Sequence, residues 1–258
     1  MNISLLNKKE LIDYCSKLGI ETSKKTIHIL KQDILLYQKN EIKISKDNGE
    51  DLSLLKFKIR ELANIYSNNL HKKIIDRKEE MTLDDNAHYL IYKVLGISYQ
   101  DGKLIDEYQN TGRFLYKYAG SFLEEASSLC LSFYNPLGSR ELVKNTLGVR
   151  PKTFEIDFLN FKDAIELKWR DATTDGDHIT KEHTRVQVIK SYGLKPIRIM
   201  FYYPQREQAI KIQETLKTLY KGIGGEYYAG DEAWEYIYNL TGYNLKLILE
   251  EIAEDRLC

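Results

Sequence analysis

Two stretches of alternating sequence after Pro151 constrain the fold more than any other part of the chain. KTFEIDFL (152–159) and AIELKW (164–169) alternate apolar and polar side chains, which is typical of strands with one buried face. The four residues between them suit a hairpin turn that pairs Leu159 with Ala164. This register predicts one apolar face and one face that gathers three carboxylates and an ammonium, with Asp157 opposite Glu166 and Glu155 opposite Lys168.

The sequence after the hairpin predicts a sheet covered by helices. A polar stretch from residue 170 precedes a helix over 180–192, and the apolar run KPIRIMFYYP (195–204) is typical of a buried strand. Helical patterns then cover 205–221, 231–240 and 244–254. Strands that alternate with helices favour an α/β class, with α+β as the alternative.

The N-terminal half is predicted to be helical. Residues 1–40 are expected to form a small accessory module of two helices, 41–53 a polar linker with an Asn-Gly turn signal, and 54–258 the main domain. Within that domain, helices are expected over 54–80, 83–95 and 113–131, and no strand is evident in 132–150.

Composition limits the class of protein. The 38 Lys+Arg balance 38 Asp+Glu, so no overall basic charge points to a nucleic-acid partner. Residues 226–255 hold eight acidic residues and one lysine, however, a local charge of −7 that leaves +7 on the remainder. The three scattered cysteines favour a reducing cytoplasm, and the lack of a run of about 18 apolar residues argues against a membrane span.

The carboxylate face of the hairpin is a candidate metal site. Two carboxylates on facing strands repel each other unless a cation or a proton lies between them. Such oxygen ligands suit Mg²⁺, and Lys168 is near enough to orient a water or to stabilise transition-state charge. The alternative is a solvated hairpin face on which Glu155 and Lys168 form a weak surface ion pair.

Asp157, eight intervening residues, and then Glu166-Leu167-Lys168 resemble the D…(D/E)-X-K signature of the PD-(D/E)XK nuclease superfamily. The resemblance implies a restriction-endonuclease-like core, with a small mixed β-sheet flanked by helices. The chain departs from the pattern in having Ile156 where the signature has proline, and in showing no clear strand before the hairpin.

A narrower resemblance covers most of 84–253. The stretches DDNAHYLIYKVLG, RPKTFEIDFL, AIELKWRDATTDGDHITKEHTRV and GGEYYAGDEAWEY look like the ApaLI-like type II restriction endonucleases. This implies Mg²⁺-dependent cleavage of double-stranded DNA at a short palindrome by a homodimer, with a cognate DNA methyltransferase in the same system. The family's name-giving member recognises GTGCAC, and carrying that target to this chain is a further step.

The same resemblance implies roles for individual residues. Asp157, Glu166 and the backbone carbonyl of Leu167 would hold Mg²⁺, and Lys168 would position the attacking water, leaving a 5′-phosphate and a 3′-hydroxyl. Glu155 would be an extra ligand or a partner of Lys168.

Nucleases of this class often add an acidic residue from an upstream helix. A helical wheel of 113–131 places Glu125 beside the apolar stripe and Glu124 away from it, so Glu125 is expected in the site. A solvated pair of glutamates is the alternative.

Residues 170–185 are expected to face DNA. The basic side chains would neutralise phosphates, and the acidic and histidine side chains would contact base edges. The residues concerned are Arg170, Lys181 and Arg185 for phosphates, and Asp175, Asp177 and His178 for bases. A second metal cluster, which would add His183, is disfavoured because the segment lacks a helical i, i+4 histidine pair and any cysteine.

Three alternatives remain open from the sequence. Residues 1–40 faintly resemble a SAP-type DNA-binding module, and packing or dimerisation would explain them equally well. The enzyme could instead be a repair or junction-resolving nuclease of the same superfamily. The chain could also be a DNA-binding module whose hairpin carboxylates are structural.

Overall fold

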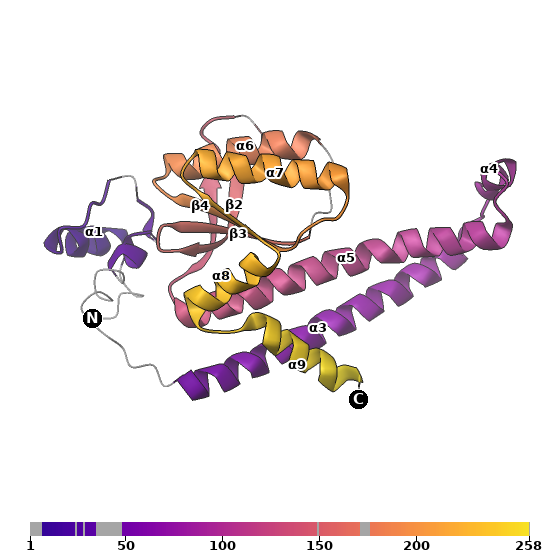
Figure 1. Cartoon of the computed structure of the whole chain (residues 1–258), viewed down its shortest axis with the longest axis horizontal. Coiled ribbons are helices and arrows are strands. Elements are labelled where there is room, and N and C mark those ends of the chain that lie inside the picture. The colour runs from indigo at the N-terminus through magenta and orange to yellow at the C-terminus, as the bar shows by residue number, and fades with distance from the viewer. Residues whose placement is uncertain are drawn as a thin grey trace. The chain divides into compact units, whose positions relative to one another are not determined.

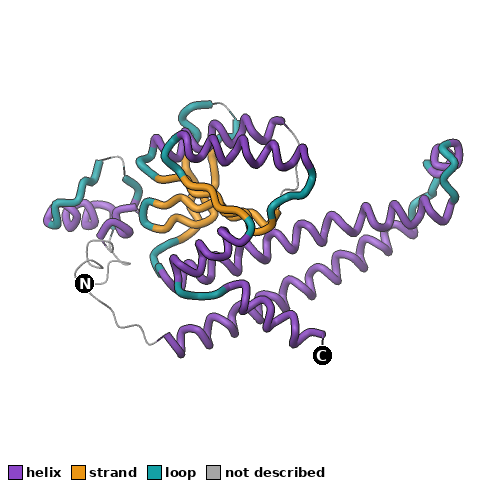
Figure 2. Tube along the Cα trace, in the orientation of Figure 1, coloured by secondary structure: helices purple, strands orange, loops and turns teal. Residues whose placement is uncertain are grey.

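A computed structural model of the chain describes residues 7–23, 25–27, 29–34, 48–148, 150–170 and 176–257 (Figures 1 and 2). The side chains of Asn48, Leu257 and residues 176–178 are not among those described. The chain forms two compact units. One combines the residues up to Lys56 with those from Glu124 onward, and the other is Phe57–Leu123.

The first unit is built on a five-stranded mixed sheet of order β1-β2-β3-β4-β5. The strands β1, β2 and β3 are antiparallel, and β3, β4 and β5 are parallel. The strands are Ser139–Lys144 (β1), Thr153–Asn160 (β2), Asp163–Arg170 (β3), Lys195–Tyr202 (β4) and Glu226–Ala229 (β5). Strand β1 lies within 132–150, where no strand is evident from the sequence. Only Val143 of β1 is buried, and that is too little to produce a visible pattern.

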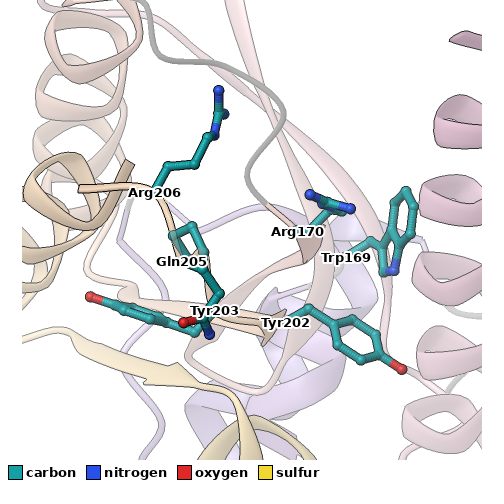
Figure 3. A pocket seen from close by; sticks show the side chains of 7 residues that line it. Trp169, Arg170, Tyr202, Tyr203, Gln205 and Arg206 are labelled. Carbon is teal, nitrogen blue, oxygen red and sulfur yellow. The ribbon is translucent and has the colours of Figure 1, made fainter. Parts of the chain in front are cut away.

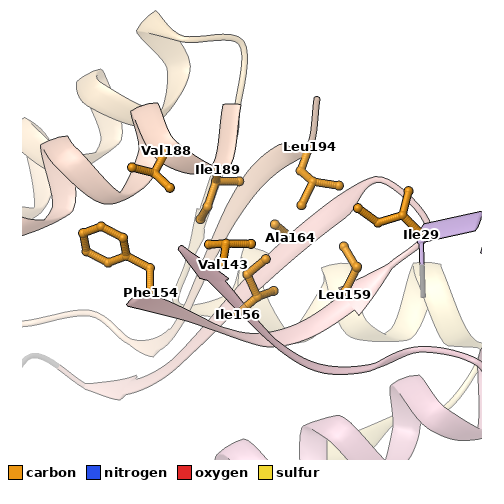
Figure 4. Packing of buried hydrophobic residues seen from close by; sticks show 9 residues of the cluster. All are labelled: Ile29, Val143, Phe154, Ile156, Leu159, Ala164, Val188, Ile189 and Leu194. Atoms are coloured by element: carbon orange, nitrogen blue, oxygen red, sulfur yellow. The ribbon is translucent and has the colours of Figure 1, made fainter. Parts of the chain in front are cut away.

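The hairpin has the predicted register at its turn, where Leu159 pairs with Ala164. A bulge interrupts β2 further along, because Ser139 pairs with Leu159 whereas Glu141 pairs with Ile156. One extra residue in a strand reverses the facing of the side chains beyond it. Phe154, Ile156 and Leu159 therefore share one apolar cluster (Figure 4), and Phe158, which strict alternation along KTFEIDFL would place with Phe154 and Ile156, is not in that cluster.

Helices cover both faces of the sheet (Figure 1). The helices α6 (Gly176–Ser191) and α7 (Glu207–Gly222) lie on one face, and α8 (Asp231–Thr241) and the end of α5 lie on the other. Ala164 packs with Val188 and Ile189 of α6, and Glu166 lies two residues along the same strand face. Glu166 therefore lies beneath α6 and is nearly buried, so the alternative of a solvated polar face does not hold for this carboxylate.

An N-terminal segment fixes the turn of the hairpin. Gln32 accepts hydrogen bonds from the Phe161 backbone nitrogen (3.0 Å) and the Asn135 side chain (2.6 Å). Its own amide donates to the Leu159 carbonyl (3.4 Å), and Ile29 joins the apolar cluster. The preceding helix α1 (Lys8–Lys17) begins with a capping box of Asn7 and Glu10, and its Cys15 is a buried packing residue.

The second unit contains most of two long helices, α3 (Asn48–Thr82) and α5 (Tyr99–Tyr134), with the short α4 (Tyr89–Val94) between them. Arg77 of α3 donates to Asn110 of α5 through Nε (3.1 Å) and an Nη atom (2.6 Å). Residues 48–53, expected as linker, form the first turns of α3, and α5 begins well before the expected residue 113. The last helix is α9 (Leu245–Leu257). No helix in the described part of the chain is long and apolar enough to cross a membrane.

Candidate active site

Lys168 is the centre of a cluster of charged groups on the sheet. Its ammonium nitrogen lies 2.6 Å from Glu166 Oε1, 3.6 Å from Asp157 Oδ2 and 3.6 Å from Glu124 Oε1. Glu166 and Lys168 are on the same face of β3 because they are two residues apart in a strand. Asp157 comes from the bulged part of β2, and Glu124 comes from α5. Three elements therefore bring three carboxylates to one ammonium.

The two hairpin carboxylates are nearly buried, with Asp157 8% and Glu166 4% exposed. Buried charges are costly unless they are paired and hydrogen-bonded. Asp157 Oδ2 accepts a hydrogen bond from the Leu167 backbone nitrogen at 2.8 Å, in addition to its contact with Lys168. This bond connects β2 to β3 just beyond their last ladder pair, Phe158 with Ile165. The predicted proximity of Asp157 to the Glu166-Leu167-Lys168 segment is confirmed.

Arg185 of α6 holds the other oxygen of Glu166. One guanidinium nitrogen donates to Glu166 Oε2 and to the backbone carbonyl of Glu155. Burial lowers the pKa of the Arg185 guanidinium, whose side chain is only 11% exposed. The expectation that Arg185 neutralises a DNA phosphate was wrong, because its α6 position directs it into the sheet rather than toward solvent.

A buried ion network continues behind Arg185. Glu182 accepts from Arg198 of β4 at 3.2 Å and from the Tyr220 hydroxyl of α7 at 2.9 Å, and its other oxygen is 3.5 Å from Arg185. Burial raises the pKa of the Tyr220 hydroxyl, so it stays a hydrogen-bond donor. Sequence reasoning missed this network. Its signal was the arginine inside the apolar run 195–204, where a charge needs a buried partner.

Glu124, rather than Glu125, is the helix carboxylate at the site. Glu124 is half-buried beside Lys168, and Glu125 is exposed. Burial raises the pKa of Glu124, and the nearby Lys168 lowers it in part. The apolar stripe of the helical wheel of 113–131 does not match the buried side of α5 at this end, where the buried positions are 123, 126, 127, 130 and 131. Glu124 precedes Ser127 by three residues and Leu131 by seven, which places it along that stripe.

Glu155 does not pair with Lys168 as expected. Its carboxylate lies 3.3 Å from Arg140 Nε of β1, and both side chains are about half exposed. The register that pairs Leu159 with Ala164 does not continue past the bulge. Glu155 therefore pairs with Leu142 of β1 instead. The Glu155 side chain is therefore separate from the Lys168 cluster, although its backbone carbonyl contacts Arg185.

The remaining expected DNA contacts are only partly described. Asp175 lies outside the described residues, and Asp177 and His178 are described only as backbone in the first turn of α6. Lys181 is exposed on that helix. Arg170 ends β3, with its guanidinium 5.6 Å from the ring centroid of Trp169.

A pocket opens where the parallel strands β3 and β4 end (Figure 3). Its volume is about 490 Å³, and it combines aromatic rings with two guanidinium groups. The lining residues are Trp169, Arg170, Tyr202, Tyr203, Pro204, Gln205 and Arg206. Trp169 and Arg170 directly follow Lys168 in β3, and none of the residues of the charged cluster lines the pocket.

The charged cluster has the oxygen ligands of a magnesium site but not a complete set. Within the described ranges, no group of three or more His, Cys, Asp or Glu side chains is arranged to hold a metal ion. Mg²⁺ in phosphate-processing sites takes only one or two carboxylates and completes its shell with water and phosphate. The Asp157 and Glu166 carboxylates could supply those one or two ligands, since both are nearly buried and both contact the Lys168 ammonium.

The mixed sheet flanked by helices is consistent with the restriction-endonuclease-like class of fold. The family model described as ApaLI-like restriction endonuclease matches residues 25–254. The chain belongs to this family, and it is therefore a nuclease that acts on DNA. No curated protein and no solved structure matches the chain.

Proposed function

We propose that the chain is a Mg²⁺-dependent type II restriction endonuclease with a PD-(D/E)XK active site. The observation that carries the proposal is the single ammonium of Lys168 in contact with Asp157, Glu166 and Glu124. An ammonium among three acidic groups is suited to hold a water molecule and to stabilise charge on a phosphate under attack. A structural ion pair would need only one of the three carboxylates.

The proposed division of roles follows the geometry. Asp157, Glu166 and the backbone carbonyl of Leu167 would hold the metal, and Mg²⁺ supplies Lewis-acid polarisation of the scissile phosphate when bound. Lys168 positions the attacking water, and Glu124 orients the ammonium. The expected products are a 5′-phosphate and a 3′-hydroxyl.

The DNA substrate is proposed to be a short palindrome that a homodimer recognises, since a two-fold protein matches a two-fold site. The GTGCAC target of the family's name-giving member is the first sequence to test. Arg170 and Lys181 are proposed phosphate contacts, and Asp175, Asp177 and His178 are proposed base contacts. A cognate methyltransferase is proposed to protect the host DNA. The SAP-like role of residues 1–40 stays a prediction.

Cleavage of a sequenced, unmethylated genome with Mg²⁺, followed by mapping of the fragment ends, tests the proposal. We expect discrete fragments that share one palindrome and carry 5′-phosphates. Cleavage of branched DNA alone would instead identify a repair or junction-resolving nuclease. An absence of any cleavage, with DNA binding retained, would identify a non-catalytic binding module.

Lys168→Ala tests the assignment of the site itself. We expect a loss of cleavage rate of ~10³-fold, because the group that stabilises the developing charge is removed. The matched control is Lys162→Ala, since Lys162 is an exposed lysine in the turn of the same hairpin. If Lys168→Ala cuts as fast as wild type, the proposed site is wrong. Ca²⁺ in place of Mg²⁺ should support DNA binding without cleavage, because its coordination is looser.

A further inference from the structure

Helix α5 carries a stripe of exposed apolar side chains within the Phe57–Leu123 unit. Between residues 104 and 119 the stripe contains no charged residue, and it consists of Leu104, Ile105, Tyr108, Leu115 and Tyr116 together with Gly112 and Ala119. These positions follow helical spacing and so lie along one side of α5. The five large side chains are between 48% and 66% exposed.

This stripe does not face the neighbouring helices of its own unit. Asn110 binds Arg77 of α3, and Asp106 accepts from the Tyr92 hydroxyl of α4. Both residues lie two positions from Tyr108, and residues two apart on a helix do not share a face. The stripe is therefore directed away from both α3 and α4.

The stripe is complementary to itself in an antiparallel arrangement. Positions 104 and 116, 105 and 115, and 108 and 112 are equally spaced about residue 110. A two-fold axis at residue 110 would thus place the largest central side chain, Tyr108, on Gly112 of the second copy. A side chain added at Gly112 would meet no atom of its own chain within 4 Å, so that position is open to a neighbour. Glycine inside a helix is otherwise unfavourable, and it permits close helix approach.

We propose that this stripe, centred on Tyr108 and Gly112, is the interface between two copies of the chain. This interface gives the position of the subunit contact in the homodimer proposed above. It is argued from the side chains of α5 and not from the cleavage chemistry. The stripe exposes on the order of 600 Å² per copy, so two copies would bury ~1,200 Å², the lower end of the range for stable interfaces. DNA is a poor occupant, because the stripe offers no lysine or arginine to a phosphate.

The oligomeric state of the full-length protein without DNA tests the interface. Sedimentation velocity over a range of concentrations should give twice the chain mass of 30.2 kDa for the wild type. Tyr108→Arg should raise the dimer dissociation constant by ~30-fold or more, as expected of a central aromatic contact. The matched control is Leu90→Arg on α4, because Leu90 is exposed to the same degree, 67% against 66%, and lies off the stripe.

A second variant keeps the test decisive if Tyr108→Arg fails to fold. The double substitution Tyr108→Cys with Gly112→Cys should form a disulfide-linked dimer under mild oxidation, and Leu90→Cys should not. A monomeric wild type, or a dimer that Tyr108→Arg leaves intact, would overturn the interface. Because no DNA is present, either result leaves the proposed endonuclease activity to be judged separately from its own cleavage assay.

Discussion

At the scale of single residues, the active-site candidate depends on how Glu166 is held. Lys168 contacts one oxygen of its carboxylate and Arg185 the other, so the group is fixed from two sides. Arg185 is in turn paired with Glu182, which contacts Arg198 and Tyr220. The arginine that sequence reasoning assigned to DNA is thus a positioning residue for a proposed metal ligand.

Arg185→Met is expected to reduce both stability and cleavage. Removing one partner of a buried ion pair leaves the other charge uncompensated, at a cost of ~3–5 kcal/mol in the free energy of unfolding. Urea unfolding measures that loss, and Lys181→Met is the control because Lys181 is exposed on the same helix. Unfolding free energies that are equal for the two variants would show that Arg185 does not hold Glu166.

At the scale of elements, the hairpin register and the position of Lys168 beside Asp157 and Glu166 could be predicted from sequence. Alternation and turn length determine a register locally, near the turn. The bulge could not be predicted, because it depends on the pairing of β2 with β1, a strand whose own pattern is weak.

The choice between Glu124 and Glu125 failed for a related reason. The buried side of α5 changes along its length, and the end that packs on the sheet buries a different stripe from the end in the other unit.

Glu124→Gln is expected to slow cleavage while raising stability at neutral pH. Burial raises the pKa of Glu124 above that of an ordinary glutamate. The folded chain therefore binds more protons than the unfolded chain between the two pKa values, and stability falls as pH rises through that window. Glutamine cannot ionise, so the thermal midpoint of the variant should exceed that of wild type at pH ~8 and approach it at pH ~4.

The cleavage rate of Glu124→Gln should fall by ~10²-fold, since Lys168 loses one of its charged partners. Glu125→Gln is the matched control and should leave both the midpoint and the rate unchanged, because Glu125 is exposed. Equal effects of the two substitutions would restore Glu125 as a candidate. Equal midpoints of Glu124→Gln and wild type at every pH would contradict the burial argument.

At the scale of the whole molecule, a net charge of zero conceals an uneven distribution. The 226–255 segment carries −7 and the rest of the chain +7, so a DNA-binding surface does not require an overall positive charge. The pocket at the ends of β3 and β4 holds two further cations, Arg170 and Arg206. The total charge was therefore a poor guide to the class of substrate.

DNA binding is expected to depend steeply on salt despite the neutral total. With Ca²⁺ present, the dissociation constant should rise ~10³-fold or more between about 50 mM and about 200 mM salt, as for six or more phosphate contacts. Arg206→Ala should lower the slope of the logarithmic plot by about one if that side chain contacts a phosphate. A dissociation constant that does not change with salt would exclude phosphate contacts by basic side chains such as Arg170, Lys181 and Arg206.

The hydrogen bonds of Gln32 with the hairpin turn have a consequence for how the chain acquires its structure. Gln32 and Leu159 are separated by 127 positions, so the N-terminal segment leaves the ribosome long before its partner exists. Contacts of such separation close late and slow the folding of the sheet. Until then, the apolar side chain of Ile29 lacks the cluster that buries it. A variant that begins after residue 34 would contain every residue of the Lys168 cluster but would lack the Gln32 hydrogen bonds that hold the hairpin turn. We expect a separate peptide of the missing N-terminal segment to bind this variant and to restore the hydrogen bonds of Gln32 with the turn.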